Sequence, residues 1–373
     1  MTRKLKILTI LGARPQFIKA ATVSRAIREY NAKNSYSIKE IIVHTGQHYD
    51  ANMSDVFFEE MDIHRPDYRL ECGGLGHGAM TGRMLEKIED ILDVEKPDWV
   101  LVYGDTNSTL AGALASSKMH IPVAHVEAGL RSFNMAMPEE INRILTDRVS
   151  NFLFCPTVTA VKNLRTEGFP FNSSSGNEQK ILNVGDVMYD ATLFYQKKAK
   201  ETVRLEKWGL VENGYALCTI HRAENTDDPN RLQSIIKALT TINKSLPIIL
   251  PLHPRTKKII SESSFANLLT FLNVIDPISY IETQRLEMSA KVILTDSGGM
   301  QKEAFFHKVP CITLRDETEW VETVESGWNR VTGASENNIL DSFENYSIPK
   351  KYLNFYGDGQ SATKILQTLL NEY

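Results

Sequence analysis

The chain has 373 residues, of which 42 % are hydrophobic and 24 % are charged, and its formal net charge is −4 at pH 7. This length is sufficient for two domains, each with its own core, and the composition is that of a globular protein. The negative net charge argues against a nucleic-acid-binding protein, which usually carries a basic surplus. It also means that a polyanionic ligand must be met by a few local cations and backbone amides.

The apolar runs of the chain are short. None of them reaches the roughly 18 residues that indicate a membrane-spanning helix. The run Ile7–Leu11, close to the N-terminus, is also too short for a signal peptide and has no small-residue cleavage site after it. We therefore expect a cytoplasmic protein that does not interact with membranes.

Neither the cysteines nor the histidines have the spacing of a metal site. Four scattered cysteines form no CxxC pair, and we expect them to be reduced and inert: Cys72, Cys155, Cys218 and Cys311. No group of His, Cys and Asp has metal-ligand spacing either. The glycine-rich segment Gly73–Gly78 does not fit G-x-G-x-x-G and is interpreted as a mobile loop. We therefore expect no metal and no cofactor.

Strand-like apolar runs alternate with amphipathic stretches, which predicts an α/β fold with parallel sheets. In the first half we expect strands at Lys6–Leu11, Glu40–His44, Trp99–Tyr103, Val123–Val126, Asn151–Cys155 and Ile181–Val184. The segment Met80–Leu92 places its apolar residues on one helical face. The polar stretch 171–178 is interpreted as a surface loop.

A second series of strands follows a polar helix near residues 190–205. Its expected strands are Ala216–Ile220, Pro247–Leu252, Val292–Leu294 and Cys311–Leu314. Two such series predict two doubly wound sheets, with the boundary between domains near residues 186–189. Ligands of such sheets bind beyond the carboxyl ends of the strands, so the residues that follow each strand are the candidates for function.

Three charged residues follow strands of the first half. Arg14 lies near a predicted helix start, where it and the helix N-terminus suit an anion, unless it is simply a solvated side chain. Asp105 follows Trp99–Tyr103 and is either functional or a cap of the next helix. Glu127 ends a buried strand, where an unpaired carboxylate is costly. It is therefore interpreted as functional, with a structural ion pair to Arg131 as the alternative.

A pair of glutamates follows in a helix start. Pro138 opens the helix and places Glu139 and Glu140 in its first turn, where a carboxylate favours the helix dipole. That structural role accounts for one of them. The other is available as a general acid or base.

The second half offers a histidine and a glycine turn. His221 ends a strand and precedes an arginine, which suits a phosphate-binding cleft, whereas a satisfied core histidine is the alternative. Ser297, Gly298 and Gly299 begin a helix after a strand and present backbone amides to an anion. Glu303 lies six residues beyond Ser297, about 9 Å along the helix axis. This spacing suits a diphosphate at the turn and ribose hydroxyls at the glutamate, although a surface charge is the simpler interpretation of Glu303.

Together these segments resemble the non-hydrolysing UDP-N-acetylglucosamine 2-epimerase family, over nearly the whole chain. The resemblance lies in Gly12–Pro15, Tyr103–Thr106, Val126–Arg131, Pro138–Glu140, His221–Arg222, Asp296–Gly299 with Glu303, and Tyr356–Gly359. It implies a GT-B-like α/β fold of two Rossmann-like, doubly wound parallel-sheet domains that face each other across a cleft. The implied domains are 1–186 and 187–354, and the final helix, 355–373, crosses back to the first domain.

The resemblance also implies a reaction and a set of site residues. One group removes the C2 proton as UDP leaves C1, and UDP adds back after a proton reaches the opposite face, so two acid/base groups are needed. The implied acid/base and orienting residues are Asp105, Glu127, Glu139 and His221. The implied substrate-binding residues are Arg14, Lys19, Arg143, Ile278, Tyr280, Thr283, Ser297, Gly298, Gly299 and Glu303, with Ile278 and Tyr280 near the uracil. A homodimer is implied as well.

Three departures from the family pattern suggest an altered substituent at C3 or C6 of the sugar. Gln16 stands where members that act on UDP-N-acetylglucosamine have Glu, the segment 132–137 is shorter, and Trp320 replaces Arg. These features resemble the branch that acts on UDP-2,3-diacetamido-2,3-dideoxy-glucuronate, which makes the manno isomer for O-antigen or capsule. UDP-N-acetylglucosamine is the alternative substrate.

Other functions of the same fold are weaker interpretations. A retaining glycosyltransferase of the GT-B class would leave the acidic residues of the first domain without a purpose. A hydrolysing epimerase would release free sugar, and nothing in the chain, such as an added kinase domain, indicates one. A non-catalytic UDP-sugar sensor would not need the acid/base residues, which are all present.

Overall fold

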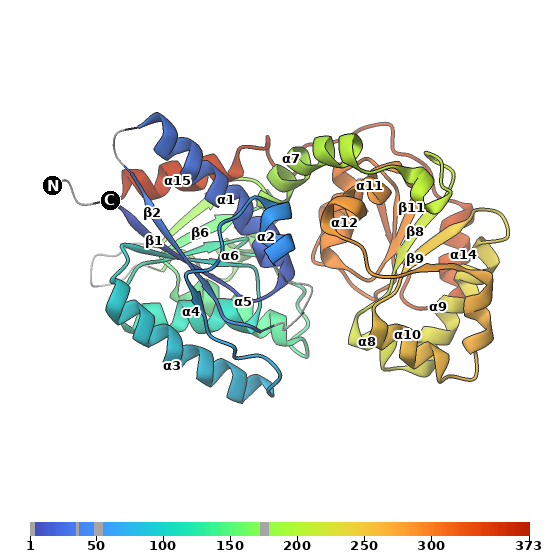
Figure 1. Ribbon diagram of the computed structural model, residues 1–373, viewed down its shortest axis with the longest axis horizontal. Helices are drawn as coiled ribbons and strands as arrows, with labels where there is room; N and C mark the ends of the chain where they lie inside the picture. The colour runs from blue at the N-terminus through green and yellow to red at the C-terminus, as the bar shows by residue number, and fades with distance from the viewer. Residues whose placement is uncertain (1–3, 35–36, 48–54, 172–178) are drawn as a thin grey trace. The chain divides into compact units, whose positions relative to one another are not determined.

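The computed structural model describes residues 4–34, 37–47, 55–171 and 179–373, without the side chains of 55–57. The loop predicted at 171–178 therefore lies almost wholly outside the described residues. The chain divides into two compact units. Unit 1 is Met1–Ala191 with Asn354–Tyr373, and unit 2 is Thr192–Leu353. Each unit contains its own parallel sheet (Figure 1).

The described part of unit 1 contains a seven-stranded sheet in the order β3-β2-β1-β4-β5-β6-β7. Its strands are β1 Lys6–Leu11, β2 Lys39–His44, β3 Tyr68–Arg69, β4 Trp99–Tyr103, β5 Val123–Val126, β6 Phe152–Cys155 and β7 Lys180–Asn183. Every neighbouring pair is parallel. The central strands are continuous apolar runs because helices cover both faces of the sheet. The six predicted strands are confirmed to within one residue, and the edge strand β3 was missed.

The helices of unit 1 cover the two faces of this sheet. They are α1 Arg14–Lys33, α2 Asp55–Met61, α3 His77–Glu95, α4 Asn107–Lys118, α5 Pro138–Val149, α6 Val158–Thr166, the beginning of α7 Val187–Thr202, which belongs to unit 2 from Thr192 onward, and α15 Ser361–Asn371. In Figure 1, α1 and α15 lie side by side on one face, and α3, α4 and α5 lie on the other. The predicted loop at Gly73–Gly78 is shorter than expected because His77 and Gly78 already belong to α3.

The C-terminal segment joins unit 1 at the start of α7. The N–H of Asp186 donates to the carbonyl of Tyr356 at 2.9 Å. Gly185 has φ +89°, and a Cβ there would lie 2.9 Å from the carbonyl oxygen of Tyr356 and 3.1 Å from the Cα of Gly357. Two backbones therefore meet where no side chain fits.

We expect Gly185→Ala to lower the free energy of unfolding by at least about 2 kcal/mol, because it combines a left-handed φ with a backbone clash. Urea titration of the purified variant measures this loss. The matched control is Gly209→Ala, which has φ +67° but no atom within 4 Å of its Cβ. Equal losses in the two variants would show that the close approach contributes nothing.

Asp190 of α7 makes stability depend on pH. Its Oδ2 accepts the N–H of Ala362 at the start of α15 at 2.9 Å. Burial raises the pKa of this carboxyl to about 6, against the lowering effect of the Ala362 and Ser361 hydrogen bonds. A raised pKa means that the folded state holds the proton more tightly. The resulting stabilisation is complete below about pH 3.8 and is lost as the pH rises through 6.

We therefore expect Asp190→Asn to flatten the pH dependence of unfolding between pH 4 and 6. At pH 7.5 it should raise the free energy of unfolding by roughly 1–3 kcal/mol, because the charged form no longer has to be buried. Thermal unfolding of both proteins from pH 4 to 8 is the measurement. Parallel pH profiles for the two proteins would contradict this prediction.

The described part of unit 2 contains a six-stranded parallel sheet in the order β10-β9-β8-β11-β12-β13. Its strands are β8 Ala216–Thr219, β9 Ile248–Pro251, β10 Asn273–Ile275, β11 Val292–Thr295, β12 Cys311–Thr313 and β13 Asn329–Val331. The four predicted strands are confirmed. The sequence did not predict β10 and β13, which are three-residue edge strands with polar residues.

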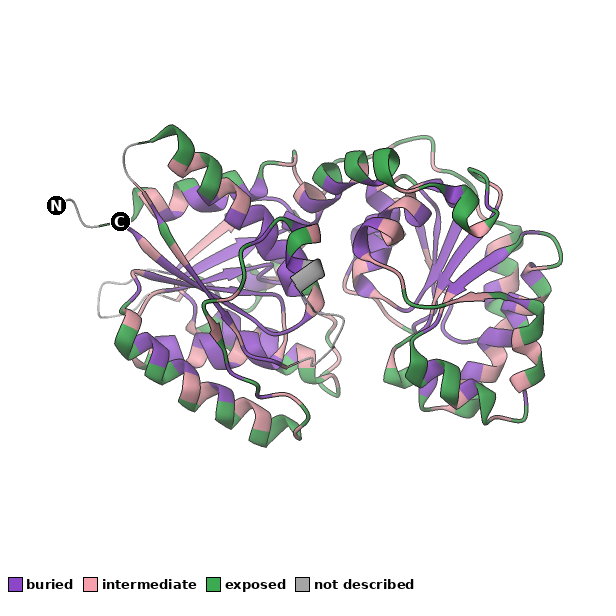
Figure 2. Ribbon diagram, viewed as in Figure 1, coloured by how far each residue is buried: buried purple, intermediate pink, exposed green. Residues whose placement is uncertain are grey.

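The helices of unit 2 also pack on both faces of its sheet. They are α8 Ala223–Thr226, α9 Pro229–Ile242, α10 Pro254–Ser261, α11 Tyr280–Ser289, α12 Gly298–Phe306, α13 Val321–Glu325 and α14 Glu336–Glu344, with 3-10 turns at Leu205–Trp208 and Ala266–Phe271. Figure 2 shows buried strands in both units, while exposed residues lie on the outer helix surfaces.

The predictions on cysteines, membranes and metals are compared with the same described residues. All four cysteines are buried free thiols, as expected. None of the described helices is long and apolar enough to cross a bilayer. Among the described residues, no group of three or more His, Cys, Asp and Glu is placed to hold a metal ion.

Candidate active site

Two carboxylates of unit 1 follow neighbouring strands. In the parallel pair β4–β5, Tyr103 lies opposite Val126, so Asp105 and Glu127 emerge at the same edge of the sheet. Glu127 has φ +75°. A non-glycine residue in this left-handed region costs on the order of 1–3 kcal/mol, and such residues concentrate at functional sites. The backbone of Glu127 is therefore held against its own preference.

The carboxylate of Glu127 is buried and paired with a lysine. Lys19 of α1 donates to its Oε2, and both side chains are nearly inaccessible. Gly104 leaves room for this pair, because a Cβ there would lie 3.3 Å from both the carboxylate and the ammonium. The alternative that paired Glu127 with Arg131 is wrong, since Arg131 forms its ion pairs with Asp147 and Glu167.

Asp105 is held by α5 and is not a helix cap. Its carboxylate pairs with Arg143, and its carbonyl accepts from Asn142 at 2.9 Å. Thr106 caps α4 instead, through its hydroxyl and the N–H of Thr109. About a third of the Asp105 side chain is accessible, so a bound ligand can reach it.

The two glutamates of the first turn of α5 have different environments. Glu140 is buried, and its carboxylate accepts from the backbone of Ser132 and Phe133 at 3.0 and 2.9 Å and from Arg143 at 2.8 Å. Glu139 is only partly buried. Glu140 thus takes the structural role, and Glu139 is the one that a ligand can reach.

The side-chain amide of Gln16 forms all of its hydrogen bonds within the protein. Its Oε1 accepts from the N–H groups of Gly12 and Ala13 at 2.8 and 3.0 Å. Its Nε2 donates to the carbonyl of Tyr103 and the hydroxyl of Thr109 at 2.8 and 2.9 Å. These four bonds use the whole capacity of the amide. Gln16 therefore fixes the start of α1 to the end of β4.

His125 of β5 connects the segment around Asp105 to α5. Its Nε2 lies 2.7 Å from the carbonyl oxygen of Gly104, and its Nδ1 lies 2.7 Å from Oδ1 of Asp147. Both side chains are inaccessible to solvent. Since a carbonyl only accepts, the Nε2–H donates to Gly104 and fixes the residue before Asp105.

Asp147 extends this network to the segment after Glu127. Its Oδ2 accepts from Arg131 at 2.7 Å and from the N–H of Gly129 at 3.2 Å. Burial alone would raise the pKa of Asp147, but the hydrogen bonds and charges of His125 and Arg131 outweigh it and hold the pKa below its usual value. One buried carboxylate therefore positions the segments that carry both acidic candidates.

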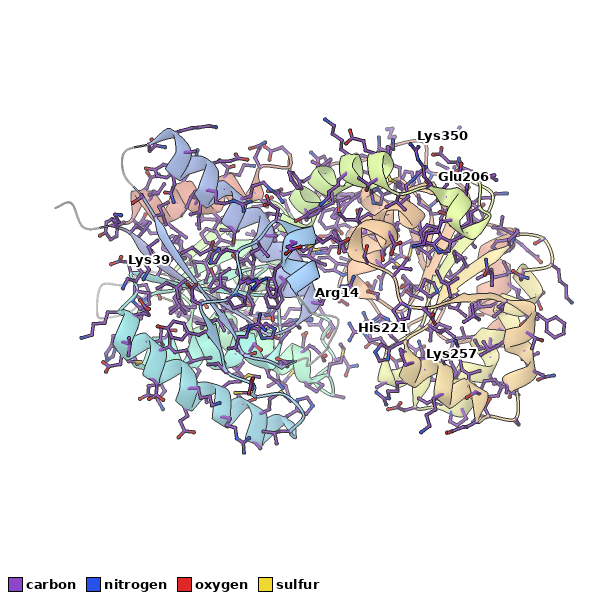
Figure 3. All side chains as sticks on the ribbon, viewed as in Figure 1. Arg14, Lys39, Glu206, His221, Lys257 and Lys350 are labelled. Atoms are coloured by element: carbon purple, nitrogen blue, oxygen red, sulfur yellow. The ribbon has the colours of Figure 1, made fainter. Side chains whose placement is uncertain are left out.

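His221 follows β8 in unit 2 and is half exposed, so the alternative of a core histidine is wrong. Its Nδ1 lies 3.1 Å from Oδ1 of the buried Asp296, which also accepts the N–H of His221 and of Arg222. Burial would raise the pKa of Asp296, but these bonds and that of Asn225 keep it low. The imidazole is thus oriented by an ionised carboxylate, with its other face accessible. Figure 3 labels His221 in unit 2 and Arg14 at the start of α1 in unit 1.

The turn Ser297–Gly299 begins α12, as predicted. Ser297 is its N-cap. The first N–H groups of a helix have no partner within the helix and face outward. A Cβ on Gly298 would lie 2.7 Å from Oε1 of Glu319 and 3.3 Å from Nε1 of Trp320. The glycine is therefore needed for close packing, and the turn offers backbone amides to an anion.

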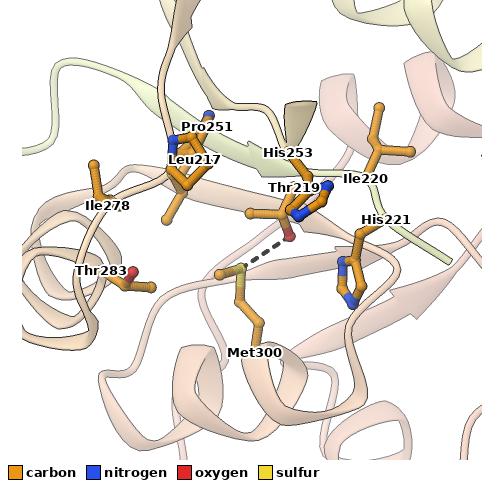
Figure 4. Close-up of a pocket in the computed structure, with 10 residues that line it drawn as sticks. Leu217, Thr219, Ile220, His221, Pro251, His253, Ile278, Thr283 and Met300 are labelled. Atoms are coloured by element: carbon orange, nitrogen blue, oxygen red, sulfur yellow. Dashed lines mark hydrogen bonds between the residues drawn. The ribbon is translucent and has the colours of Figure 1, made fainter. Parts of the chain in front are cut away.

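A cavity of about 160 Å³ opens at the carboxyl ends of β8 and β9. Its lining includes Thr219, His221, His253, Ile278, Thr283 and Met300 (Figure 4). The structure thus brings together His221, Ile278 and Thr283 among the predicted ligand-binding residues. Tyr280, predicted beside Ile278, is buried, and its hydroxyl donates to Oε1 of Glu303 at 2.8 Å. Glu303 is also mostly buried, so the interpretation as a surface charge is wrong.

A family model described as UDP-N-acetylglucosamine 2-epimerase matches residues 30–370. The chain belongs to this family. A Pseudomonas aeruginosa protein named UDP-2,3-diacetamido-2,3-dideoxy-D-glucuronate 2-epimerase is 53 % identical over 98 % of this chain and 99 % of its own length. Epimerases are isomerases, so membership of this family makes the chain an isomerase.

Solved structures agree with this family. The UDP-GlcNAc 2-epimerase of Methanocaldococcus jannaschii in complex with UDP-GlcNAc and UDP is 43 % identical, with a TM-score of 0.87 over 99 % of this chain and 100 % of that one. The Neisseria meningitidis enzyme bound to UDP-GlcNAc is 31 % identical, with a TM-score of 0.86 over 98 % and 100 %. The predicted GT-B-like class of two Rossmann-like domains is confirmed.

Trp320 lies beside the glycine turn. Its buried ring packs over the ammonium of Lys302, which lies 3.9 Å from the ring centroid, and its Nε1 approaches Gly298. Arg315, which is buried, pairs with the neighbouring Glu319 at 3.1 Å. A buried aromatic ring thus stands beside the turn.

Proposed function

We propose that the chain is a non-hydrolysing 2-epimerase of UDP-2,3-diacetamido-2,3-dideoxy-glucuronate that converts the gluco isomer into the manno isomer. The observation that carries the substrate is the 53 % identity, over nearly the full length of both chains, to the P. aeruginosa protein named for it. The observation that supports the chemistry is the pair of carboxylates after β4 and β5, each held by a cation.

The proposed reaction is an elimination followed by an addition. A base removes the proton from C2 while the bond between C1 and the UDP oxygen breaks, which gives an unsaturated sugar and UDP. A proton then reaches C2 on the opposite face, and UDP adds back to C1. The two faces need two groups, and we propose that they come from Asp105, Glu127 and Glu139, with His221 as the fourth acid/base or orienting group.

We propose that unit 2 holds the UDP. The uracil would lie near Ile278, Tyr280 and Thr283, two of which line the cavity, and the ribose would lie at Glu303. The amides at Ser297, Gly298 and Gly299, together with His221, would stabilise the charge that develops on the diphosphate. In unit 1, we propose Arg14 as a further residue that binds the substrate. Arg143 and Lys19 would contact the substrate while fixing Asp105 and Glu127.

UDP-N-acetylglucosamine is the second candidate substrate. It is favoured by the M. jannaschii complex, which contains this compound at 43 % identity. The two substrates differ at C3 and C6, so they share the chemistry at C2. Trp320, at a position where the resemblance implies an arginine in members that act on UDP-N-acetylglucosamine, favours the diacetamido compound, because it changes a side chain at the edge of the glycine turn.

Proton NMR in D2O tests both proposals, with each UDP-sugar in its own tube. We expect deuterium at C2 and a manno product with an intact UDP linkage in the tube of the diacetamido compound. Exchange only with UDP-N-acetylglucosamine would transfer the assignment to the second candidate. If neither sugar exchanges its C2 proton while UDP still binds, epimerisation of both substrates is refuted.

We further propose that the enzyme is a cytoplasmic homodimer that supplies a sugar nucleotide for a surface polysaccharide such as O-antigen or capsule. A nucleotide-linked acidic sugar is charged and needs a glycosyltransferase to consume it, which supports this setting. Light scattering at micromolar concentration measures the oligomer. Loss of the surface polysaccharide on deletion of the gene, restored by the intact gene, tests the cellular role.

A further inference from the structure

Two carboxyl groups lie together between α11 and α12 in unit 2. Glu287 of α11 is completely buried, and Glu303 of α12 is 5 % exposed. The side-chain nitrogen of Gln284 bridges them, since it donates to Oε2 of Glu287 at 2.8 Å and to Oε1 of Glu303 at 2.7 Å. Tyr280 donates to the same oxygen of Glu303.

His307 fixes the direction of this network. Its Nε2 lies 2.9 Å from Oε1 of Gln284. Burial lowers the pKa of His307 to about 3, so the ring is neutral and its Nε2–H donates to the amide oxygen. The amide nitrogen of Gln284 must then face the carboxyl groups. A neutral His307 also supplies no positive charge to Glu287, although its Nε2 lies only 3.8 Å from Oε2.

The surroundings of the second oxygen of Glu287, Oε1, indicate that this carboxyl group carries a proton. Oε1 is buried and accepts no hydrogen bond from any donor in the described part of the chain. Burial, together with the charge and hydrogen bond of Glu303, raises the pKa of Glu287 well above its usual value. Two ionised carboxylates in contact would repel strongly in such an environment. One proton on Oε1 of Glu287 removes this repulsion and turns the unpartnered oxygen into a hydrogen-bond donor.

We propose that Glu287 is a positioning residue for nucleotide recognition: as a carboxylic acid it donates a hydrogen bond to Glu303 and holds Glu303 as the anion that accepts the ribose hydroxyls of UDP. This inference rests on the proposed function, in which Glu303 binds the ribose. The titratable groups that face Glu287 from the elements around it are Glu303, His307, Tyr280, Tyr215 and Cys311. Burial raises the pKa of each neighbouring phenol and thiol, so these groups stay neutral at pH 7.

Calorimetric titration with UDP and with 2′,3′-dideoxy-UDP tests the proposal. The ratio of the two affinities reports the contacts of Glu303 with the ribose hydroxyls. Glu287→Gln keeps a neutral donor beside Glu303, and we expect it to retain the wild-type ratio to within threefold. Glu287→Leu removes the donor, and we expect it to lower the affinity for UDP about tenfold without changing that for the dideoxy compound. Equal losses for both nucleotides in Glu287→Leu would overturn the proposal.

Glu303→Ala separates this inference from the proposed function. It should abolish the preference for UDP over the dideoxy compound. If Glu303→Ala keeps the preference, the assignment of the ribose to Glu303 fails. If it loses the preference while Glu287→Leu keeps it, only the role of Glu287 fails.

Infrared spectroscopy tests the proton without depending on the folding of Glu287→Leu. At pH 7 the wild-type protein should show the C=O band of a buried, protonated carboxyl group. The difference spectrum between the wild type and Glu287→Gln should contain this band, whereas Asp190→Asn and Glu40→Gln, which remove two other carboxyls whose pKa burial raises, should retain it. A wild-type spectrum without the band, or a band of unchanged intensity in Glu287→Gln, would overturn the proposal.

Discussion

Glu127→Gln reduces the exchange of the C2 proton of the UDP-sugar by about 10²–10⁴-fold, the usual contribution of a positioned acid/base group, and leaves the binding of UDP within threefold of wild type. This result is expected because Gln keeps the size of the side chain and a hydrogen-bond acceptor for Lys19 but cannot accept the proton. The strained backbone of Glu127, with φ +75°, is itself an indication that this position serves chemistry rather than stability.

The measurement is deuterium incorporation at C2 by proton NMR, combined with calorimetric titration of UDP. Glu89→Gln is the matched control, since it neutralises an exposed glutamate of α3. It should exchange the C2 proton at the wild-type rate. If Glu127→Gln retains at least half of the wild-type rate, Glu127 is not an acid/base residue, and the role passes to Asp105 and Glu139.

The positions of most strands could be predicted from the sequence because buried parallel strands are continuous apolar runs. Trp99–Tyr103, for example, is buried at every residue. Three of the four edge strands of the described sheets, β3, β10 and β13, could not be predicted. Asn273–Ile275 and Asn329–Val331 each pair on one side only and contain polar residues, so they lack the continuous apolar run that indicates a buried strand.

The partners of the candidate residues were less predictable than the residues themselves. The sequence placed Asp105 and Glu127 after strands, but the cations that hold them come from α1 and α5, whose packing is decided by the tertiary fold. The partners of Gln16 were not predictable for the same reason. The sequence linked it only to the substituent of the sugar and did not predict its four hydrogen bonds, which are all internal. His125, an isolated polar residue in an apolar strand, was the available signal for the missed network.

Among the residues of the His125 network, which the sequence did not predict, we expect removal of Asp147 to cost the most free energy of unfolding. It accepts hydrogen bonds from His125, Arg131 and the N–H of Gly129, and it is inaccessible to solvent. Breaking a buried ion pair by removing one partner typically costs about 3–5 kcal/mol, because the remaining charge is left without compensation. We therefore expect Asp147→Ala to lower the free energy of unfolding by about this amount at pH 7, and to reduce turnover because both acidic segments lose their support.

Urea titration at several pH values measures this loss, with Asp90→Ala, an exposed aspartate of α3, as the control. Because the pKa of Asp147 is held below its usual 3.8, its stabilisation is complete above about pH 4 and is lost as the pH falls through the folded-state pKa. The difference between wild type and Asp147→Ala should therefore be constant from pH 5 to 8 and shrink in acid. A loss below 1 kcal/mol at pH 7 would show that the ion pair of Arg131 with Glu167 carries the network alone, and that His125 needs no anionic partner to hold Gly104 in place.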